Sequence, residues 1–338
     1  MRVQALVLAA FVGGCGAEAT TAAAEEQPAP PRAPLDPRPS ACGECHGEIV
    51  EQWRGSLHAR AWSDEVFRAE YDRAPAASCR DCHNPPTRAP EGEGIDCATC
   101  HLREGRILAL HDGPEASAAH PITLEPALAG PESCARCHQF TFTDDGVHDP
   151  SEALQNTVAE WRASEAATEG RDCRSCHMPE GDHSLLGLDD PALLAGAVEL
   201  ELAARRAAEA IEVEVRLRGA RIGHAFPTGD LFRQGRLIVT SEDGSEASLS
   251  LQRHLARTAD ADGEDLHVRT VDDTRVPAPG TGELRELLRI ADPDARTLSW
   301  RLELHRLPRA RARERGLSEA ATVVEIDRGV LTEIDSAQ

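Results

Sequence analysis

Ten of the eleven cysteines stand in five copies of one pattern, in which two residues separate a pair of cysteines and a histidine follows the second. Cysteines at this spacing can each form a thioether with one vinyl group of the same heme, and the adjacent histidine can then reach the iron. The predicted thioether cysteines are Cys42, Cys45, Cys79, Cys82, Cys97, Cys100, Cys134, Cys137, Cys173 and Cys176, and the predicted proximal iron ligands are His46, His83, His101, His138 and His177. Zinc ribbons and redox disulfides also use paired cysteines, but they do not need a histidine after every pair. The pattern therefore predicts five covalently bound hemes c.

A second set of histidines lies outside the motifs and is large enough to fill the sixth position on every iron. The candidate distal ligands are His58, His120, His183, His224, His111 and His148. On a continuous helix His58 would lie about 18 Å from His46, so it is predicted to bind the iron of a neighbouring heme. His224 would bring a ligand from the second half of the chain. The remaining histidines, His254, His267 and His305, are expected on the surface.

The composition limits the class of protein and its partners. The 338 residues are 41% hydrophobic but only 3% aromatic, and attached hemes would supply the missing large apolar groups. The formal net charge is −22, so no basic surplus is available to bind nucleic acid. This charge suits basic redox proteins as partners, or it serves solubility alone. All 36 basic residues are arginine, because the sequence contains no lysine.

The N-terminus predicts export. Residues 1–14 have a basic residue, Arg2, near their start and contain an apolar run that is too short to span a bilayer, as in a signal peptide. Cys15 follows two glycines and is predicted to be the lipidated first residue of a lipoprotein, which would be periplasmic or attached to the outer membrane or cell surface. Ordinary cleavage that removes Cys15 is the alternative. Residues 15–41 are rich in Ala and Pro and predict a flexible tether.

Residues 42–190 are predicted to form an α-helical, loop-rich heme domain. The best helical patterns cover residues 47–72 and 151–168, with Ser151 as the N-cap of the second. These two segments form an internal repeat that aligns Trp53 with Trp161. The repeat places Ala166 where the first copy has a histidine, so one copy offers an iron ligand and the other does not.

Residues 195–338 contain no cysteine and have a different pattern. Runs of alternating apolar and polar residues, separated by turn residues, predict an antiparallel β-sandwich of roughly seven strands. Residues 196–210 and 307–319 are rich in Ala, Arg and Glu, and a helix is an alternative prediction for both.

Several of these segments resemble the bacterial multiheme cytochrome c superfamily, which includes the tetraheme cytochrome of ammonia oxidisers, hydroxylamine oxidoreductase and pentaheme nitrite reductase. The segments are CATCHLREGR, CARCHQF, QNTVAEW, CRSCHMP and GHAFPTG, and the chain resembles exported members with a C-terminal β-domain more than it resembles these named members. The resemblance implies that His58 is a distal ligand and that His120, His183 and His224 are similarly placed. Ala166 departs from the pattern.

Three functions follow as hypotheses. Histidines on both sides of each iron would make the chain an electron carrier in an extracytoplasmic respiratory or redox chain, with no catalytic residue, and this is the favoured prediction. An open iron would instead allow a reductase or oxidase of a small nitrogen or sulfur species. The lysine that replaces the motif histidine in nitrite reductases is absent, and the single tyrosine, Tyr71, lies close to no motif in the sequence. The third hypothesis is a subunit of an extracellular heme polymer or redox scaffold.

Overall fold

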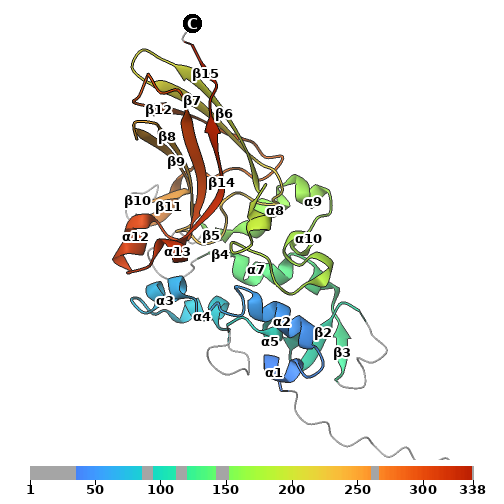
Figure 1. The fold of residues 1–338 in the computed structure, drawn as a ribbon. Helices are drawn as coiled ribbons and strands as arrows, with labels where there is room; N and C mark the ends of the chain where they lie inside the picture. The colour runs from blue at the N-terminus through green and yellow to red at the C-terminus, as the bar shows by residue number, and fades with distance from the viewer. Residues whose placement is uncertain (1–35, 86–93, 112–119, 142–151, 260–265, 337–338) are drawn as a thin grey trace, which may run out of the picture. The chain divides into compact units, whose positions relative to one another are not determined.

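The computed structural model describes residues 36–85, 94–111, 120–141, 152–259 and 266–336. The predicted signal peptide, Cys15, most of the tether, His148 and Ser151 lie outside these residues. Short helices and loops make up the first part of the described chain, and strands dominate after residue 197 (Figure 1). The sheet-rich second part contains several antiparallel sheets, as the alternating pattern predicted.

The first part is built from short helices, and four of the five cysteine motifs form the end of one. The helices are α1 (Pro39–Cys42), α2 (Gly47–Gly55), α3 (Glu65–Tyr71), α4 (Ala77–His83), α5 (Cys97–His101), α7 (Glu132–His138), α8 (Thr157–Arg162), α9 (Glu165–Thr168), α10 (Cys173–His177) and α11 (Pro191–Leu194), with 3-10 turns η1 (Pro126–Ala129) and η2 (Pro179–Gly181). Asp96 and Asp172 cap α5 and α10, because each carboxylate accepts a hydrogen bond from a backbone N–H in the first turn. These caps fix where the motif helices begin.

Two small sheets follow the third and fourth motifs. Strands β1 (Leu102–Arg103), β2 (Arg106–Ala109) and β3 (Ile122–Leu124) form one, and β4 (Gln139–Thr141) and β5 (Ala153–Asn156) form the other. The third and fourth motifs thus each lead directly into a strand, and the chain then turns back in the antiparallel partner of that strand.

Both long helices expected in this part are broken, which corrects the sequence prediction. The first ends at Gly55, where Ser56 takes an extended conformation, and α3 begins only after Asp64. The Asp64 carboxylate accepts from the N–H groups of Val66 and Phe67, so a new helix starts there. In the second, strand β5 occupies the expected first turn, and Asn156 stands at the N-cap of α8.

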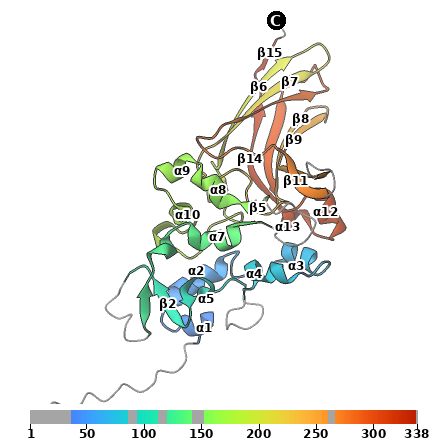
Figure 2. The same cartoon turned by 180° about the vertical axis from the view of Figure 1, so that it is seen from behind.

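The second part contains two four-stranded sheets and a hairpin. One sheet has the order β12-β7-β6-β15, the other β14-β13-β8-β9, and β10 pairs with β11. Strands β6 and β7 of the first sheet and β8, β9 and β14 of the second are labelled in Figure 2. The strands are β6 (Val198–Arg206), β7 (Ile211–Gly219), β8 (Gln234–Ser241), β9 (Glu246–Leu251), β10 (Arg253–Ala259), β11 (Leu266–Asp273), β12 (Leu284–Ile290), β13 (Leu298–His305), β14 (Val323–Leu331) and β15 (Ile334–Asp335). Apolar side chains from both sheets form one buried cluster that includes Val213, Leu217, Leu237 and Leu302.

Residues 196–210 form strand β6, so the helical alternative is wrong there, whereas residues 307–319 contain helix α12 (Arg309–Glu314). Helix α13 (Glu319–Thr322) follows it. His305 was expected on the surface but is fully buried at the end of β13, where its Nε2 lies 2.8 Å from the Glu303 carboxylate. The carboxylate partner offsets the cost of burying the ring.

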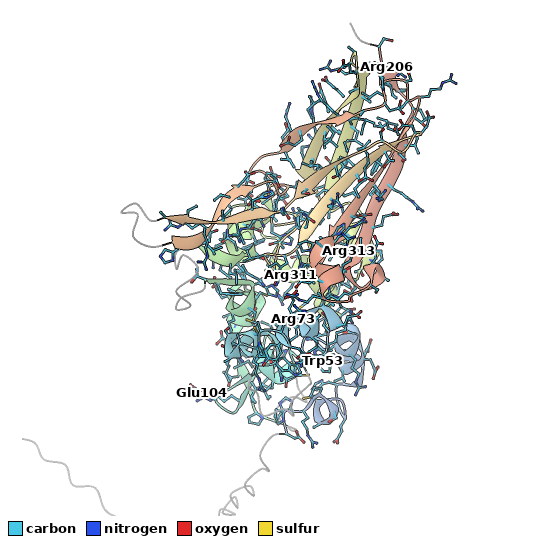
Figure 3. All side chains as sticks on the ribbon, turned by 90° about the vertical axis from the view of Figure 1, so that its left-hand side faces the viewer. Trp53, Arg73, Glu104, Arg206, Arg311 and Arg313 are labelled. Atoms are coloured by element: carbon cyan, nitrogen blue, oxygen red, sulfur yellow. The ribbon has the colours of Figure 1, made fainter. Side chains whose placement is uncertain are left out.

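Helices α12 and α13 lie beside α3 in both ribbon views (Figures 1 and 2). The Arg311 guanidinium donates two hydrogen bonds of 2.7 Å to the Glu70 carboxylate, and Arg306 donates one of 2.7 Å to Asp64. Arg73 forms a further ion pair of 3.1 Å with Glu314, and Figure 3 shows Arg73 and Arg311 close to this contact. These ion pairs tie the sheet-rich part to the segment before the second motif.

Among the described residues, no helix is long and apolar enough to cross a membrane.

Candidate cofactor site

Four of the five motif histidines face a second histidine at the same distance. The ring centroids lie 6.3 Å apart in each of the pairs His46–His120, His58–His138, His101–His183 and His177–His224. A metal–imidazole bond is about 2.0–2.1 Å long, so two imidazoles on opposite sides of one metal have ring centres roughly 6 Å apart. The spacing in all four pairs therefore fits a single metal ion between the two rings.

Several of these rings are oriented by the backbone so that one nitrogen faces the partner ring. The Nδ1 atoms of His101 and His177 lie 2.9 and 2.6 Å from the carbonyl oxygens of Leu108 and Leu186. His183 Nδ1 likewise lies 2.8 Å from a carbonyl oxygen. Because a carbonyl oxygen can only accept, Nδ1 carries the proton and Nε2 keeps a lone pair for a metal.

Burial keeps these imidazoles neutral. It lowers the pKa of His58 to about 4 and that of His138 to about 3. Burial also lowers the pKa of His183 and His224. A neutral imidazole is the form that binds a metal, so these four buried rings are ready to act as ligands near neutral pH.

The donor set points to a porphyrin. Each pair supplies two donors, and in the described chain no group of three or more His, Cys, Asp or Glu side chains could hold a metal ion by itself. A metal between two imidazoles needs four more donors in the plane between them, and a porphyrin provides these. Each pair also includes a motif histidine, so two cysteines suited to thioether bonds lie next to it in the sequence.

The five motifs are neighbours in space. Cysteine side chains from different motifs lie close together, Cys42 beside Cys97, Cys82 beside Cys137 and Cys134 beside Cys173. The third and fourth motifs are joined by a hydrogen bond of 3.3 Å from Arg136 to the Thr99 carbonyl oxygen. Groups attached to the five motifs would therefore form one contiguous set.

His83, in the second motif, is the exception. Its Nδ1 lies 3.1 Å from the Ala61 carbonyl oxygen, so its Nε2 is also left for a metal. Phe67 stacks on its ring at a centroid distance of 3.9 Å, and none of the described histidines faces it as a sixth ligand. His111 is exposed, and His148 lies outside the described residues.

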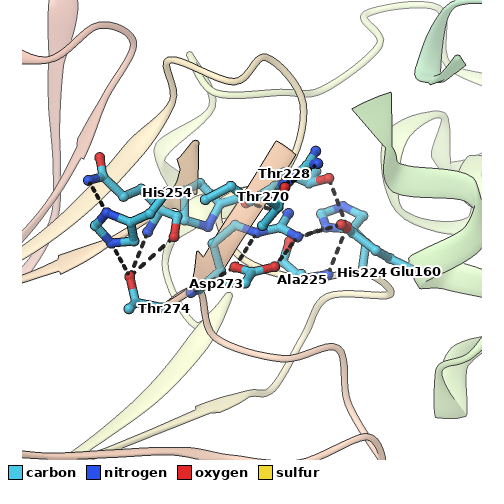
Figure 4. A network of polar contacts seen from close by, with 12 residues as sticks. Glu160, His224, Ala225, Thr228, His254, Thr270, Asp273 and Thr274 are labelled. Carbon is cyan, nitrogen blue, oxygen red and sulfur yellow. Dashed lines mark hydrogen bonds and ion pairs between the residues drawn. The ribbon is translucent and has the colours of Figure 1, made fainter. Parts of the chain in front are cut away.

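The loop that carries His224 is held by residues that the sequence prediction missed. The Glu160 carboxylate forms an ion pair with Arg275 Nη2 at 2.8 Å, and it accepts hydrogen bonds from Thr228 Oγ1 at 3.0 Å and from the Ala225 N–H at 3.3 Å (Figure 4). The Glu160 and Arg275 side chains are 9% and 10% exposed. In the sequence, the only feature that could have drawn attention to Glu160 is its position next to Trp161 in the repeat.

The structure explains why the second copy of the repeat has Ala166. The Trp53 and Trp161 indole N–H groups each donate, at 2.8 Å, to the carbonyl oxygen two residues before a motif. The carbonyl oxygens of His58 and Ala166 each accept, at 2.9 Å, from a backbone N–H, so the two positions are equivalent. A Cβ on Gly223 would lie 3.3 Å from the Ala166 Cβ, so the loop bearing His224 occupies the space that a larger side chain at 166 would need.

Comparisons with known proteins agree with a multiheme cytochrome c fold. A family model described as cytochrome c7 and related cytochrome c matches residues 33–102. The solved structure of a pentaheme cytochrome c552 from Thermochromatium tepidum matches with a TM-score of 0.65 and 20% sequence identity, over 86% of this chain and 97% of that chain. A match of that extent includes much of the sheet-rich part as well as the helices. No curated protein matches the sequence.

Proposed function

We propose that this chain is an exported c-type cytochrome that carries five hemes and transfers electrons. The observation that supports it most is the set of four histidine pairs at 6.3 Å, each joining a motif histidine to one from elsewhere in the chain. In this proposal the ten motif cysteines form the thioethers and the motif histidines are the proximal ligands. His120, His138, His183 and His224 then face His46, His58, His101 and His177 across four irons.

A carrier needs its redox groups close together and closed to substrates. When bound, heme supplies one-electron chemistry at its iron. The chain keeps the hemes close together, because its motifs adjoin one another. It also closes each iron between two histidines to substrates, because the two imidazoles leave no free position on that iron. Backbone carbonyls hold the imidazoles in the orientation that ligation requires.

One observation favours a second candidate function, a reductase or oxidase of a small nitrogen or sulfur species. His83 faces Phe67 instead of a second described histidine, so an iron held there would keep a free position. His148 is the remaining candidate for that position.

We further propose that residues 1–14 are a lipoprotein signal peptide, that Cys15 is lipidated and that residues 15–41 form the tether. The net charge of −22 supports basic redox proteins as partners.

The proposal is tested on protein expressed with a cytochrome c maturation system. Intact mass should exceed the processed chain by about 3 kDa for five hemes, and the C79A/C82A variant should lose one heme mass. The H254A variant is the control, because His254 hydrogen-bonds Gln252 and Thr274 and no motif histidine, so this variant should keep all five. EPR of the oxidised protein should show at least four low-spin irons, and a fifth, high-spin iron would support the second candidate. A product at the bare polypeptide mass would refute heme attachment.

A further inference from the structure

The imidazole of His83 is held by two residues that lie close together in the chain. The Ala61 carbonyl oxygen lies 3.1 Å from its Nδ1 and sets the direction in which Nε2 points. Phe67 lies flat on the ring, with 3.9 Å between the ring centroids and 12° between the planes. The stacked ring opposes rotation of the imidazole about that direction, so the position of Phe67 decides how His83 is oriented.

Helix α3 in turn decides where Phe67 lies. The Phe67 N–H donates a hydrogen bond of 3.0 Å to the carboxylate of Asp64, the N-cap of this helix. Trp62 and Tyr71 pack against the Phe67 ring, each with its ring centroid 5.5 Å away. The single tyrosine of the chain is thus one aromatic ring away from His83, and any contact that moves α3 also moves Phe67.

Residues 306–315, from the sheet-rich part, hold α3 at two points. Arg306 donates a hydrogen bond of 2.7 Å to Asp64 at the start of the helix. Near its end, the Glu70 carboxylate accepts two bonds of 2.7 Å from Arg311 and one of 3.2 Å from Arg315. The Asp64 and Glu70 side chains are only 11% and 21% exposed, so water screens these ion pairs less than pairs on the surface.

An apolar contact supports the ion pairs. Val66, on α3, is buried in a cluster with Leu307 and Ala312 of the sheet-rich part. Successive side chains on a helix point about 100° apart, so Val66 and Phe67 can contact different neighbours. One turn of α3 therefore contacts the sheet-rich part through Val66 and the second motif through Phe67.

We propose that residues 306–315 position the His83 imidazole through α3 and Phe67, so that the sheet-rich part sets the redox properties of the second motif. The orientation and packing of an axial imidazole are levers on the potential of a heme iron. At this motif none of the described histidines is a second ligand, which leaves His83 as the ligand through which the described chain acts. Phe67, Asp64 and Glu70 are positioning residues in this inference, which rests on the heme attachment of the proposed function.

The experiment compares the holoprotein with variants at three points of this connection. F67L removes the stacked ring, whereas F67Y keeps it. E70Q weakens the contact with two arginines, and E70Q/R306Q weakens the contacts near both ends of α3. E212Q is the matched control, because the Glu212 carboxylate also pairs with two arginines, its side chain is 5% exposed, and it lies on strand β7, away from α3.

Each variant is first checked for its full heme mass and is then titrated electrochemically, with EPR spectra recorded on the oxidised protein. The signal that is missing from the C79A/C82A variant belongs to the second motif. F67L and E70Q/R306Q should change the EPR signal of that iron and shift its reduction equilibrium threefold or more, which is about 28 mV. E70Q should shift it in the same direction by less. The other four irons should stay as in the wild type, and all five should do so in F67Y and E212Q.

Two results would overturn the proposal. If E70Q/R306Q leaves the second motif as E212Q does, the sheet-rich part does not position His83. If E70Q/R306Q shifts all five irons alike, these contacts serve only the stability of the whole fold. A wild-type product without heme mass would instead refute heme attachment, so failure of the proposed function is recognised separately.

Discussion

Glu160 is predicted to keep His224 opposite His177, and the Glu160→Gln variant tests this. The carboxylate joins helix α8 to the loop 222–229 through Arg275, Thr228 and the backbone of Ala225. Removing one partner of a buried ion pair commonly costs about 3–5 kcal/mol. Here Arg275 keeps a contact of 2.8 Å with Asp273, and glutamine keeps one acceptor oxygen. We therefore expect a loss of about 2 kcal/mol, or roughly 30-fold in the equilibrium that docks the loop.

This loss has two readouts. The free energy of unfolding of the holoprotein, measured with denaturant, should fall by about 2 kcal/mol. External imidazole can reach the iron only when His224 has left it. The apparent affinity of imidazole for one iron should therefore rise roughly 30-fold in the Glu160→Gln variant.

The control is Glu201→Gln, whose side chain is 56% exposed and pairs with Arg218, so its effect should stay below about 0.5 kcal/mol. A double-mutant cycle with Arg275→Gln should give a coupling of about 1 kcal/mol or more. If the Glu160 and Glu201 variants agree in both unfolding free energy and imidazole affinity, Glu160 does not position this loop.

Three further outcomes are expected. The H58A variant should convert one low-spin iron to high-spin in the EPR spectrum, whereas H254A should convert none, because His254 faces no motif histidine. The W53F variant removes the donor to a backbone carbonyl and should lower the free energy of unfolding by about 1–3 kcal/mol in denaturant titrations, and an unchanged value would show that the bond is dispensable. Hydrogen bonds from Arg311 hold the pKa of Glu70 below its ordinary value of 4.5, so this contact stabilises the fold in full well above that pH and is lost as the pH falls through the lowered pKa. The unfolding midpoints of wild type and R311Q should therefore differ at pH 7 and converge as the pH falls well below 4.5, and a constant difference would contradict this linkage.

Local sequence patterns were sufficient to predict the heme motifs and several of the strands. The spacing of cysteine and histidine within five residues defines each motif, and no distant part of the chain is needed to recognise it. Alternation with a period of two likewise marked strands such as β7, because one face of most of this strand is buried and the other is exposed. Strands β11 and β14 show this alternation less clearly, since Val271 and Val330 on them are exposed.

Other features depend on contacts that the sequence does not display. The helix expected over 47–72 breaks because Asp64 caps a new helix and Arg306, far along the chain, binds the same carboxylate. His305 looked like a surface residue because its burial depends on packing between elements that are distant in the sequence.

The sequence by itself determined which side chains can hold a heme, because thioether spacing and an adjacent imidazole are properties of five consecutive residues. The sequence also contains more histidines than five irons would require. Only the tertiary structure decided which of them face each other, since His46 meets His120 and His177 meets His224 across long stretches of chain. Such pairs form when packing, capping and ion pairs such as Glu160–Arg275 bring two segments together, and no local pattern encodes that distance.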